Sequence, residues 1–335
     1  MNAWEAAKNA LECVLEAKKG ESVAIFCDFE KINIGEAFVN GALKLGLRAR
    51  LFPFKTAANV HREDIPKDVT EVITKQKPDI YINVLRGKRE ETPFRIKLMR
   101  MQLEGQSRLG HCPGVTLDML TDGAMALTVQ EHKQMQTFAD KLIKKLGDAK
   151  RVRITNPTGT DVSLNVKGRP FFADTKIDAP TMKHLNLPTG EVTVAPVEDS
   201  LEGKLVCDMC IGGIGQIDAP VEISATKGKV SKVFSARPAV LRGVEDSLKT
   251  DEWSSTVGEF ALGVNPKARF INELLESEKI LGTIHIAFGN NSDMPNGKNK
   301  SGNHMDFLVS KPTVQVFKED GSSFSVLAKG AFQRL

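Results

Sequence analysis

The sequence is poor in aromatic residues and carries little excess charge. It holds one tyrosine and two tryptophans among 335 residues, and 46 lysines and arginines nearly balance 42 aspartates and glutamates, for a net charge of +4. A nucleic-acid surface usually combines a basic face with aromatic side chains on which bases stack. No apolar run approaches the roughly 20 residues that span a bilayer. We therefore expect neither a nucleic-acid partner nor a membrane partner.

Cysteine is also scarce, with five residues: Cys13, Cys27, Cys112, Cys207 and Cys210. Few, scattered thiols are typical of a reducing compartment. The first 20 residues form an amphipathic pattern with acidic side chains, unlike a secretory signal, so we predict a cytoplasmic protein. Cys207 and Cys210 form a CxxC pair, but a structural zinc site needs a second pair of similar spacing. The sequence has none, which favours two buried thiols over a zinc site.

The first part of the chain alternates apolar runs with segments of helical spacing. Strands are predicted at 22–27, 47–54 and 79–85, with helices between them. This alternation is typical of a parallel sheet covered by helices. The cluster from Gly110 to Gly114 is predicted to be a turn that closes this part.

The second part changes to short β segments. A helix over 130–146 is predicted to connect the two parts, and an Asn-Pro-Thr-Gly hairpin signal follows at 156–159. A further helix is predicted over 266–277. The fold class is therefore α/β: an N-terminal parallel α/β domain over residues 1–147, followed by a mixed α+β metal-binding domain over residues 148–335.

Two histidines and an aspartate gather in residues 281–309. At the two-residue period of a strand, His285 lies on one face of an apolar run, and His304 and Asp306 share one face of the next. A loop rich in Asn and Gly joins the two runs. Two imidazoles and a carboxylate raised from apolar strands predict a divalent-metal site. Two surface histidines beside a turn are the alternative.

Two glutamates stand out by their surroundings. Glu191 follows a Pro-Thr-Gly turn directly into a strand, and Glu259 lies in the mostly apolar run 257–263. An ionised carboxylate in an apolar segment is costly unless it is paired or bound to a metal. The sequence leaves open whether each side chain is such a buried acid or a strand-edge residue that faces solvent.

The segments around these residues resemble the thermophilic metallo-aminopeptidase family, that of aminopeptidase T. They are Asn-Leu-Pro-Thr-Gly-Glu-Val, Gly-Glu-Phe-Ala-Leu-Gly-Val-Asn-Pro, His-Ile-Ala-Phe-Gly and Asn-Gly-Lys-Asn-Lys-Ser-Gly-Asn-His-Met-Asp. The resemblance is close in the C-terminal half and limited to the general pattern in the N-terminal half. It implies that two divalent metals are held by Glu191, Glu259, His285, His304 and Asp306.

The resemblance also implies an activity and partners. We expect a metal-dependent aminopeptidase-like hydrolase, in which a metal-activated water attacks the amide bond beside a free N-terminal amine. The substrate would be a small peptide or another small molecule, and the family leads us to expect a homodimer. Zn, Co or Mn suit a ligand set of mixed nitrogen and oxygen without thiolate.

One position departs from the family pattern. The aminopeptidases carry a catalytic tyrosine seven residues after the first ligand histidine, and this chain has Ser292 there. The same superfamily includes 2,5-dihydroxypyridine 5,6-dioxygenase, which opens an aromatic ring with one Fe(II) on two histidines and an aspartate. A mononuclear Fe(II) dioxygenase is therefore the alternative, and a non-catalytic metal-binding relative is a third. Glu259 favours the dinuclear hydrolase, because the dioxygenases have histidine at that position.

Overall fold

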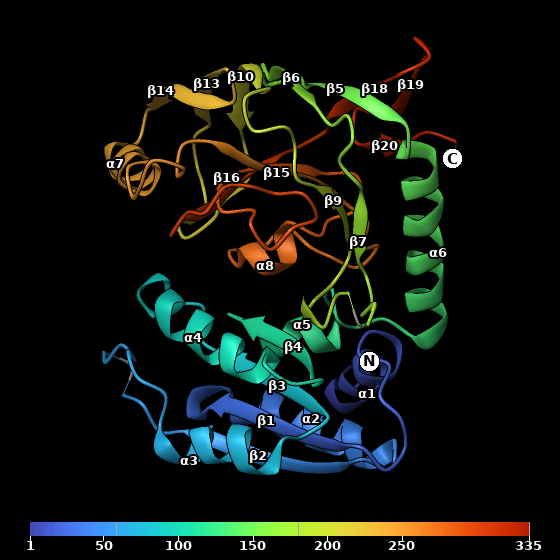
Figure 1. Cartoon of the computed structure of the whole chain (residues 1–335), viewed down its shortest axis with the longest axis vertical. Coiled ribbons are helices and arrows are strands. Elements are labelled where there is room, and N and C mark those ends of the chain that lie inside the picture. Colours follow the sequence, from blue (N-terminus) through green and yellow to red (C-terminus); the bar gives the residue numbers. More distant parts are fainter. Residues whose placement is uncertain (58, 180, 335) are drawn as a thin grey trace. The chain divides into compact units, whose positions relative to one another are not determined.

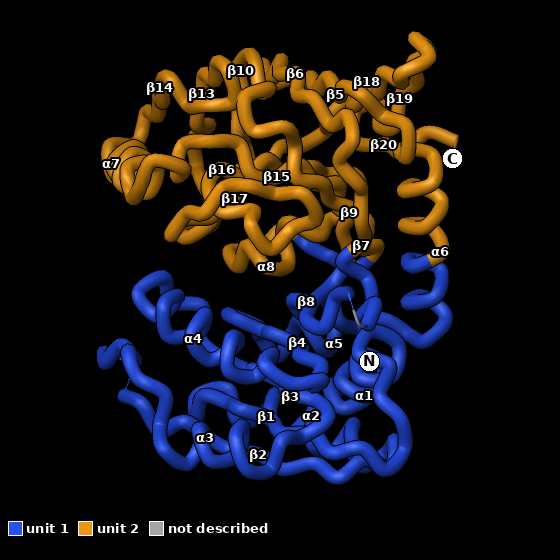
Figure 2. The backbone as a smooth tube through the Cα atoms, viewed as in Figure 1, with its two compact units in different colours: residues 1–136, 174–189, 267–269 blue, residues 137–173, 190–266, 270–335 orange. Residues whose placement is uncertain are grey.

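The computed structural model describes residues 1–57, 59–179 and 181–334 (Figure 1). The chain forms two compact units (Figure 2). Unit 1 consists of residues 1–136, 174–189 and 267–269, and unit 2 of residues 137–173, 190–266 and 270–335. The predicted domain boundary after residue 147 stays a prediction.

Unit 1 is built on a five-stranded parallel sheet in the order β2-β1-β3-β4-β8 (Figure 2). The strands predicted at 22–27, 47–54 and 79–85 are confirmed as β1, β2 and β3. The connections between these strands pass through helices, since parallel strands need long crossover connections. The elements are α1 Ala3–Cys13, β1 Ser22–Asp28, η1 Phe29–Lys31, α2 Ile32–Lys44, β2 Arg48–Phe54, α3 Lys67–Glu71, η2 Val72–Gln76, β3 Ile80–Leu85, η3 Arg89–Glu91, α4 Thr92–Leu103, β4 Arg108–Pro113, α5 Leu117–Thr121 and β8 His184–Asn186.

The predicted turn at Gly110 to Gly114 is wrong, because β4 runs through it from Arg108 to Pro113. Gly110 is a strand residue for a packing reason. A Cβ added there would lie 2.7 Å from Leu187 Cδ1 and 3.0 Å from Ile82 Cδ1. The glycine therefore marks a close approach of neighbouring side chains rather than a chain reversal.

Unit 2 contains an eight-stranded sheet, β14-β13-β10-β6-β5-β18-β19-β20, and a seven-stranded sheet, β12-β11-β17-β16-β15-β9-β7. Helix α6, Val129–Leu146, passes from unit 1 into unit 2. The other elements are β5 Ala149–Thr155, β6 Asp161–Asn165, β7 Phe172–Asp174, β9 Glu191–Val194, β10 Glu202–Cys207, β11 Cys210–Ile211, β12 Gly215–Gln216, β13 Val221–Thr226, β14 Lys229–Ser235, α7 Pro238–Leu248, β15 Val257–Gly263, α8 Leu274–Ser277, β16 Ile284–Gly289, β17 His304–Val309, β18 Thr313–Lys318, β19 Ser323–Ala328 and β20 Ala331–Phe332.

The two sheets of unit 2 differ in burial. Strands β6 and β13 of the eight-stranded sheet alternate between buried and more accessible residues, as in a sheet with one solvated face. Strands β9, β15 and β16 of the other sheet are buried along their whole length. Polar side chains on these three strands are thus in the interior, where they need partners.

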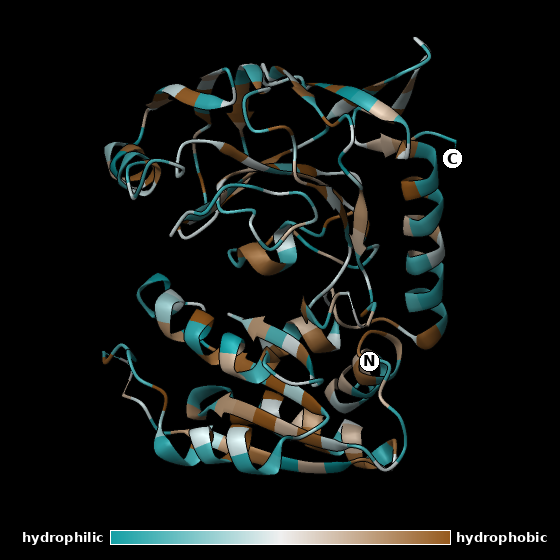
Figure 3. Cartoon of the chain, in the orientation of Figure 1, coloured by the Kyte–Doolittle hydropathy of each residue, from teal (hydrophilic) through white to brown (hydrophobic). Residues whose placement is uncertain are grey.

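Helix α6 is mostly hydrophilic in sequence, with hydrophobic residues at intervals (Figure 3). Met135, Ala139, Leu142 and Leu146 recur at the spacing of one helix face and are buried. Across the residues that the structure describes, no helix combines the length and the apolar character needed to cross a membrane.

The helix predicted over 266–277 is mostly wrong, since only Leu274–Ser277 is helical. Tertiary contacts compete with the helical pattern. The Ser277 hydroxyl donates to the carbonyl of Ile271 and accepts from its N–H, which a helix would pair with the carbonyl four residues earlier. Backbone groups that a helix would pair internally are satisfied elsewhere.

Candidate metal centre

Four of the five candidate ligands follow from the register of three adjacent strands. Ala287 of β16 lies opposite Glu259 of β15 on one side and Asp306 of β17 on the other. Because side chains alternate along a strand, His285 lies on the same face as Ala287, and His304 on the same face as Asp306. One face of the seven-stranded sheet thus collects two imidazoles and two carboxylates.

Glu191 joins this face from β9, where it lies opposite Gly263 of β15. The residues between the candidate ligands are small: Gly263, Ala261 and Ala287 occupy the same face. Short side chains at these positions leave space above the sheet. The five residues that the sequence singled out are therefore brought together on one face of the sheet, where all but His304 are buried.

The ligand atoms lie at distances that suit a shared cation. His304 Nε2 is 3.2 Å from Glu259 Oε2 and 3.3 Å from Asp306 Oδ1. His285 Nε2 is 3.5 Å from Glu191 Oε2 and 3.8 Å from Glu259 Oε1. Atoms that bind one metal at about 2.0–2.2 Å lie roughly 3 to 3.5 Å from one another. The separations within the cluster are close to this range.

Glu259 takes part in two groups of possible ligands. Glu191, Glu259 and His285 form one, and Glu259, His304 and Asp306 form another, with the ligand atoms of each within 4.8 Å of one another. Its Oε1 faces His285 and its Oε2 faces His304. A carboxylate with one oxygen toward each group has the arrangement of a bridging ligand.

The surroundings hold these ligands in place and leave one side accessible. His304 Nδ1 lies 2.8 Å from the carbonyl oxygen of Asn290, which can only accept, so Nδ1 carries the hydrogen and Nε2 is free to bind a metal. The Thr193 hydroxyl donates to Glu259 Oε1. The His304 side chain is 37% exposed, whereas that of His285 is 2% exposed. Solvent reaches the cluster at His304.

Two further residues of this cluster, Glu278 and Lys279, were not predicted from the sequence. Glu278 forms a third group of possible ligands with His285 and Asp306. Lys279, only 1% exposed, donates to Glu191 Oε1 at 2.5 Å and lies 2.9 Å from Glu278 Oε1. Burial, followed by the charges of Glu191 and Asp306, raises the pKa of Glu278 to about 7 despite Lys279. In sequence, both residues look like the charged end of a solvated helix.

The cluster carries more negative charge than its own cations balance. Burial alone would lower the pKa of His285, but the carboxylate of Glu259, together with those of Glu191 and Asp306, raises it to about 9. For His304, too, burial lowers the pKa, but the carboxylates of Asp306 and Glu259 raise it by more. The pKa of His304 therefore lies well above its ordinary value. Without metal, protons on the two imidazoles supply the missing positive charge. Divalent ions are the other way to supply it.

One buried carboxylate oxygen without a hydrogen-bond partner is also suited to bind a metal. Glu191 Oε2 is buried and has no hydrogen-bond partner, although Oε1 of the same carboxylate has one. An unpaired buried carboxylate oxygen is expensive. Bound to a cation, it would be satisfied, so the residues present fit a divalent metal.

The remaining candidates lie elsewhere. Ser292 is in the loop between β16 and β17, where its hydroxyl donates to Asn290 Oδ1 at 2.9 Å. Cys207 and Cys210 are buried and free, and no group of possible metal ligands among the described residues includes them. Burial raises the pKa of Cys210 to about 12. The interpretation of this pair as buried thiols agrees with their place in the fold.

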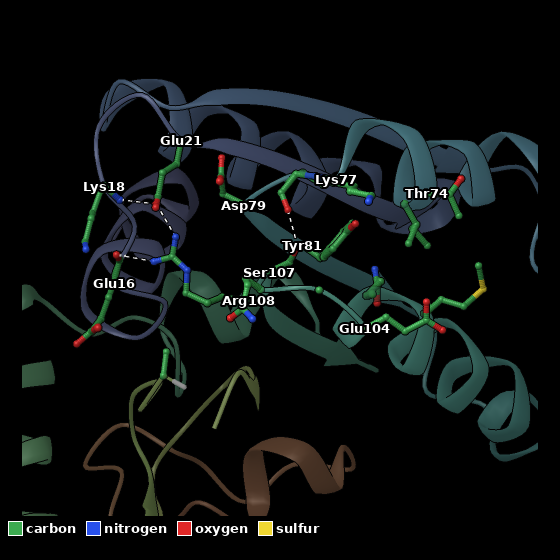
Figure 4. A pocket seen from close by; sticks show the side chains of 17 residues that line it. Glu16, Lys18, Glu21, Thr74, Lys77, Asp79, Tyr81, Glu104, Ser107 and Arg108 are labelled. Carbon is green, nitrogen blue, oxygen red and sulfur yellow. Dashed lines mark hydrogen bonds and ion pairs between the residues drawn. The ribbon is translucent and has the colours of Figure 1, made fainter. Parts of the chain in front are cut away.

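Unit 1 has a hollow of about 870 Å³ at the amino-terminal ends of β1, β3 and β4 (Figure 4). Tyr81, the single tyrosine of the chain, lines it and is 1% exposed, and burial raises its pKa to about 12. Two of the other lining residues, Glu21 and Arg108, form an ion pair at 2.6 Å. Parallel sheets usually bind ligands at the carboxyl ends of their strands, so this hollow gives no functional assignment.

Comparison with known proteins agrees with the chemistry of the cluster. Residues 124–332, well over half of the chain, match the model of the thermophilic metalloprotease family, M29. The chain belongs to this family. All five candidate ligands of this M29 member lie within the matched segment, and the predicted resemblance is confirmed. No curated protein matches the chain.

Two solved structures share the fold of this M29 member. Wild-type AmpT from Thermus thermophilus is 18% identical, with a TM-score of 0.74, and the match covers 99% of this chain and 98% of that one. A 2,5-dihydroxypyridine dioxygenase from Pseudomonas putida KT2440 is 15% identical, with a TM-score of 0.71, and coverage is 99% and 96%. At these identities the similarity shows the fold alone. The predicted α/β class is confirmed.

Proposed function

We propose that this chain is a two-metal aminopeptidase that removes residues from the free amino end of small peptides. The observation that carries the proposal is Glu259, which directs Oε1 toward His285 and Oε2 toward His304. Membership of a metalloprotease family and the balance of charge in the cluster support it. The chain would act in the cytoplasm, as a homodimer.

In this proposal, Glu191, Glu259 and His285 hold one metal, and Glu259, His304 and Asp306 hold the other. Two divalent ions at these positions would lower the pKa of a shared water and polarise the scissile carbonyl. Zn, Co and Mn suit the nitrogen and oxygen ligands. Asn290 fixes the ring of His304, and Thr193 fixes the carboxylate of Glu259. The exposed side of His304 gives substrate access.

Turnover on simple peptides is expected to be slow. Ser292 stands at the family's tyrosine position, and its hydroxyl already donates to Asn290. The loss of one donor to a developing oxyanion typically costs about 2.7–4 kcal/mol of transition-state stabilisation. We therefore expect either a weak peptidase or an enzyme whose substrate carries an amide bond outside a simple peptide.

One observation also suits the dioxygenase alternative. Asp306 Oδ1 lies 3.3 Å from His304 Nε2 and 3.9 Å from His285 Nε2. Two imidazoles around one carboxylate are the ligand set of mononuclear, oxygen-using iron sites. Glu191 and Glu259 would then have no role as ligands, although both face the same space. The two-metal proposal uses all five residues.

The test is the metal content of protein purified without added metal, read together with two assays. The proposal requires two divalent ions per chain and hydrolysis of an aminoacyl-anilide. One iron per chain, with oxygen consumption in the presence of a dihydroxypyridine, would establish the alternative instead. Metal binding without either activity would indicate a non-catalytic relative. A range of aminoacyl groups is needed, because slow turnover is expected.

A further inference from the structure

Lys279 is a buried cation beside the candidate metal centre but not a metal ligand in any group described above. Its side chain is 1% exposed, and its ammonium lies 2.5 Å from Glu191 Oε1 and 2.9 Å from Glu278 Oε1. Its backbone is fixed as well, because its carbonyl accepts from the Asn265 N–H at 2.9 Å. A lysine buried to this degree is rare unless it is paired.

The contact divides the Glu191 carboxylate into two unequal oxygens. Oε1 is held by the ammonium, whereas Oε2 has no hydrogen-bond partner and lies 3.5 Å from His285 Nε2. The terminal torsion of glutamate is broad and has little preference of its own. The donor at Oε1 therefore determines which oxygen faces the cluster.

We propose that Lys279 is a positioning residue that holds Glu191 as a one-oxygen ligand, with Oε2 directed at the metal position that Glu191 shares with Glu259 and His285. This inference rests on the proposed two-metal function. Without the ammonium, the carboxylate can rotate away or bind through both oxygens, which changes the coordination of that metal only. Partners that orient a ligating group in this way typically contribute about 10- to 100-fold in metal affinity.

Glu278 balances the charge of the lysine. When both glutamates are ionised, Glu191, Glu278 and Lys279 together carry one negative charge, and removal of Lys279 alone leaves two carboxylates close together in the interior. An uncompensated buried charge is strongly destabilising. The double variant Glu278→Gln/Lys279→Met restores the net charge of the trio and still removes the donor to Glu191. Compared with Glu278→Gln alone, which keeps the donor, it separates positioning both from charge balance and from any direct contact of Glu278 with a metal.

The experiment is a titration of the metal-free chain with Co²⁺, followed by visible absorption and calorimetry. We expect two binding steps in the wild type. Lys279→Met, and the double variant if the single one does not fold, should weaken one step by about 10- to 100-fold and change its absorption spectrum, with the other step unchanged. Lys279→Arg should recover part of the loss. His304→Ala should weaken the opposite step, and Lys249→Met, which alters an exposed lysine, should change neither.

Three results would overturn the inference. Two unaltered steps in the double variant would show that Glu191 needs no donor. Equal weakening of both steps, without recovery in Lys279→Arg, would show a structural role for the lysine. A wild-type chain that binds no metal, or one per chain, would refute the two-metal function itself, so the two failures are distinguishable.

Discussion

In the proposed two-metal centre, Glu259 is the residue on which the number of bound metals depends. It offers one oxygen to each group of ligands, so a substitution there should act on metal count before anything else. Glu259→His should leave one metal per chain and abolish hydrolysis, because an imidazole cannot bridge two ions as a carboxylate does. Metal analysis and aminoacyl-anilide hydrolysis measure both effects. Glu222→Gln, which alters an exposed ion pair, is the control. Two bound metals and intact hydrolysis in Glu259→His would refute the proposal that Glu259 bridges the two metals.

The two histidines make metal binding depend on pH. In the metal-free chain the pKa of His285 is about 9, and that of His304 lies well above its ordinary value. A metal binds the neutral ring, so each imidazole must lose a proton. Affinity should therefore rise with pH up to about 9 and fall as pH is lowered, by up to about tenfold per pH unit for each proton released. Calorimetry in buffers of different ionisation enthalpy counts these protons, and a pH-independent affinity would contradict the raised pKa values.

At the scale of elements, the loop between β16 and β17 is held by side chains at its base. Asp251 accepts from the Ser301 hydroxyl at 2.9 Å and from the Gly302 N–H at 2.7 Å. Asn299 donates to the carbonyls of Val257 and Gly289. These bonds fix the chain immediately before β17, where the first residue is His304.

Asp251→Ala should therefore weaken metal binding at a distance. We expect a loss of about tenfold in affinity at the metal position that uses His304, because the ring is less well oriented. The position that uses His285 should be unaffected. Asp320→Ala is a matched control, since Asp320 holds Ser322 in a similar turn between β18 and β19. Co²⁺ titration of both variants gives the comparison, and equal effects would show that the Asp251 contact has no bearing on His304.

The predictions of strands and helices are correct where the local sequence pattern and the tertiary structure agree. The two-residue period placed His304 and Asp306 on one face, and the strand register of β15, β16 and β17 does the same. The predicted helix over 266–277 is mostly wrong because the Ser277 hydroxyl bonds to the backbone of Ile271 and competes with the helical pairing there. Strand β4 was not predicted because the sequence does not distinguish a glycine that permits close packing from a glycine that forms a turn.

At the scale of the whole molecule, the contacts that complete the cluster join residues far apart in sequence. Lys279 and Glu191 are 88 positions apart. No local pattern connects them, and a charged stretch near a short helix is typical of a solvated surface. The five candidate ligands could be named because each lies in a segment similar to the family, whereas the buried lysine and Glu278 could be found only in the folded structure.

The two units should respond differently to metal. A ligand that binds only the folded state stabilises it by about 2.7 kcal/mol when present at 100 times its Kd, and all five candidate ligands belong to unit 2. The chain has one tryptophan in each unit, Trp4 in unit 1 and Trp253 in unit 2. Trp4→Phe leaves Trp253 to report the unfolding of unit 2, and Trp253→Phe leaves Trp4 to report that of unit 1. In urea, a chelator should move the unfolding transition reported by Trp253 to a lower denaturant concentration and leave the transition reported by Trp4 nearly unchanged. Identical shifts of both transitions would show that the two units unfold together. No shift of either transition would show that no metal stabilises the fold.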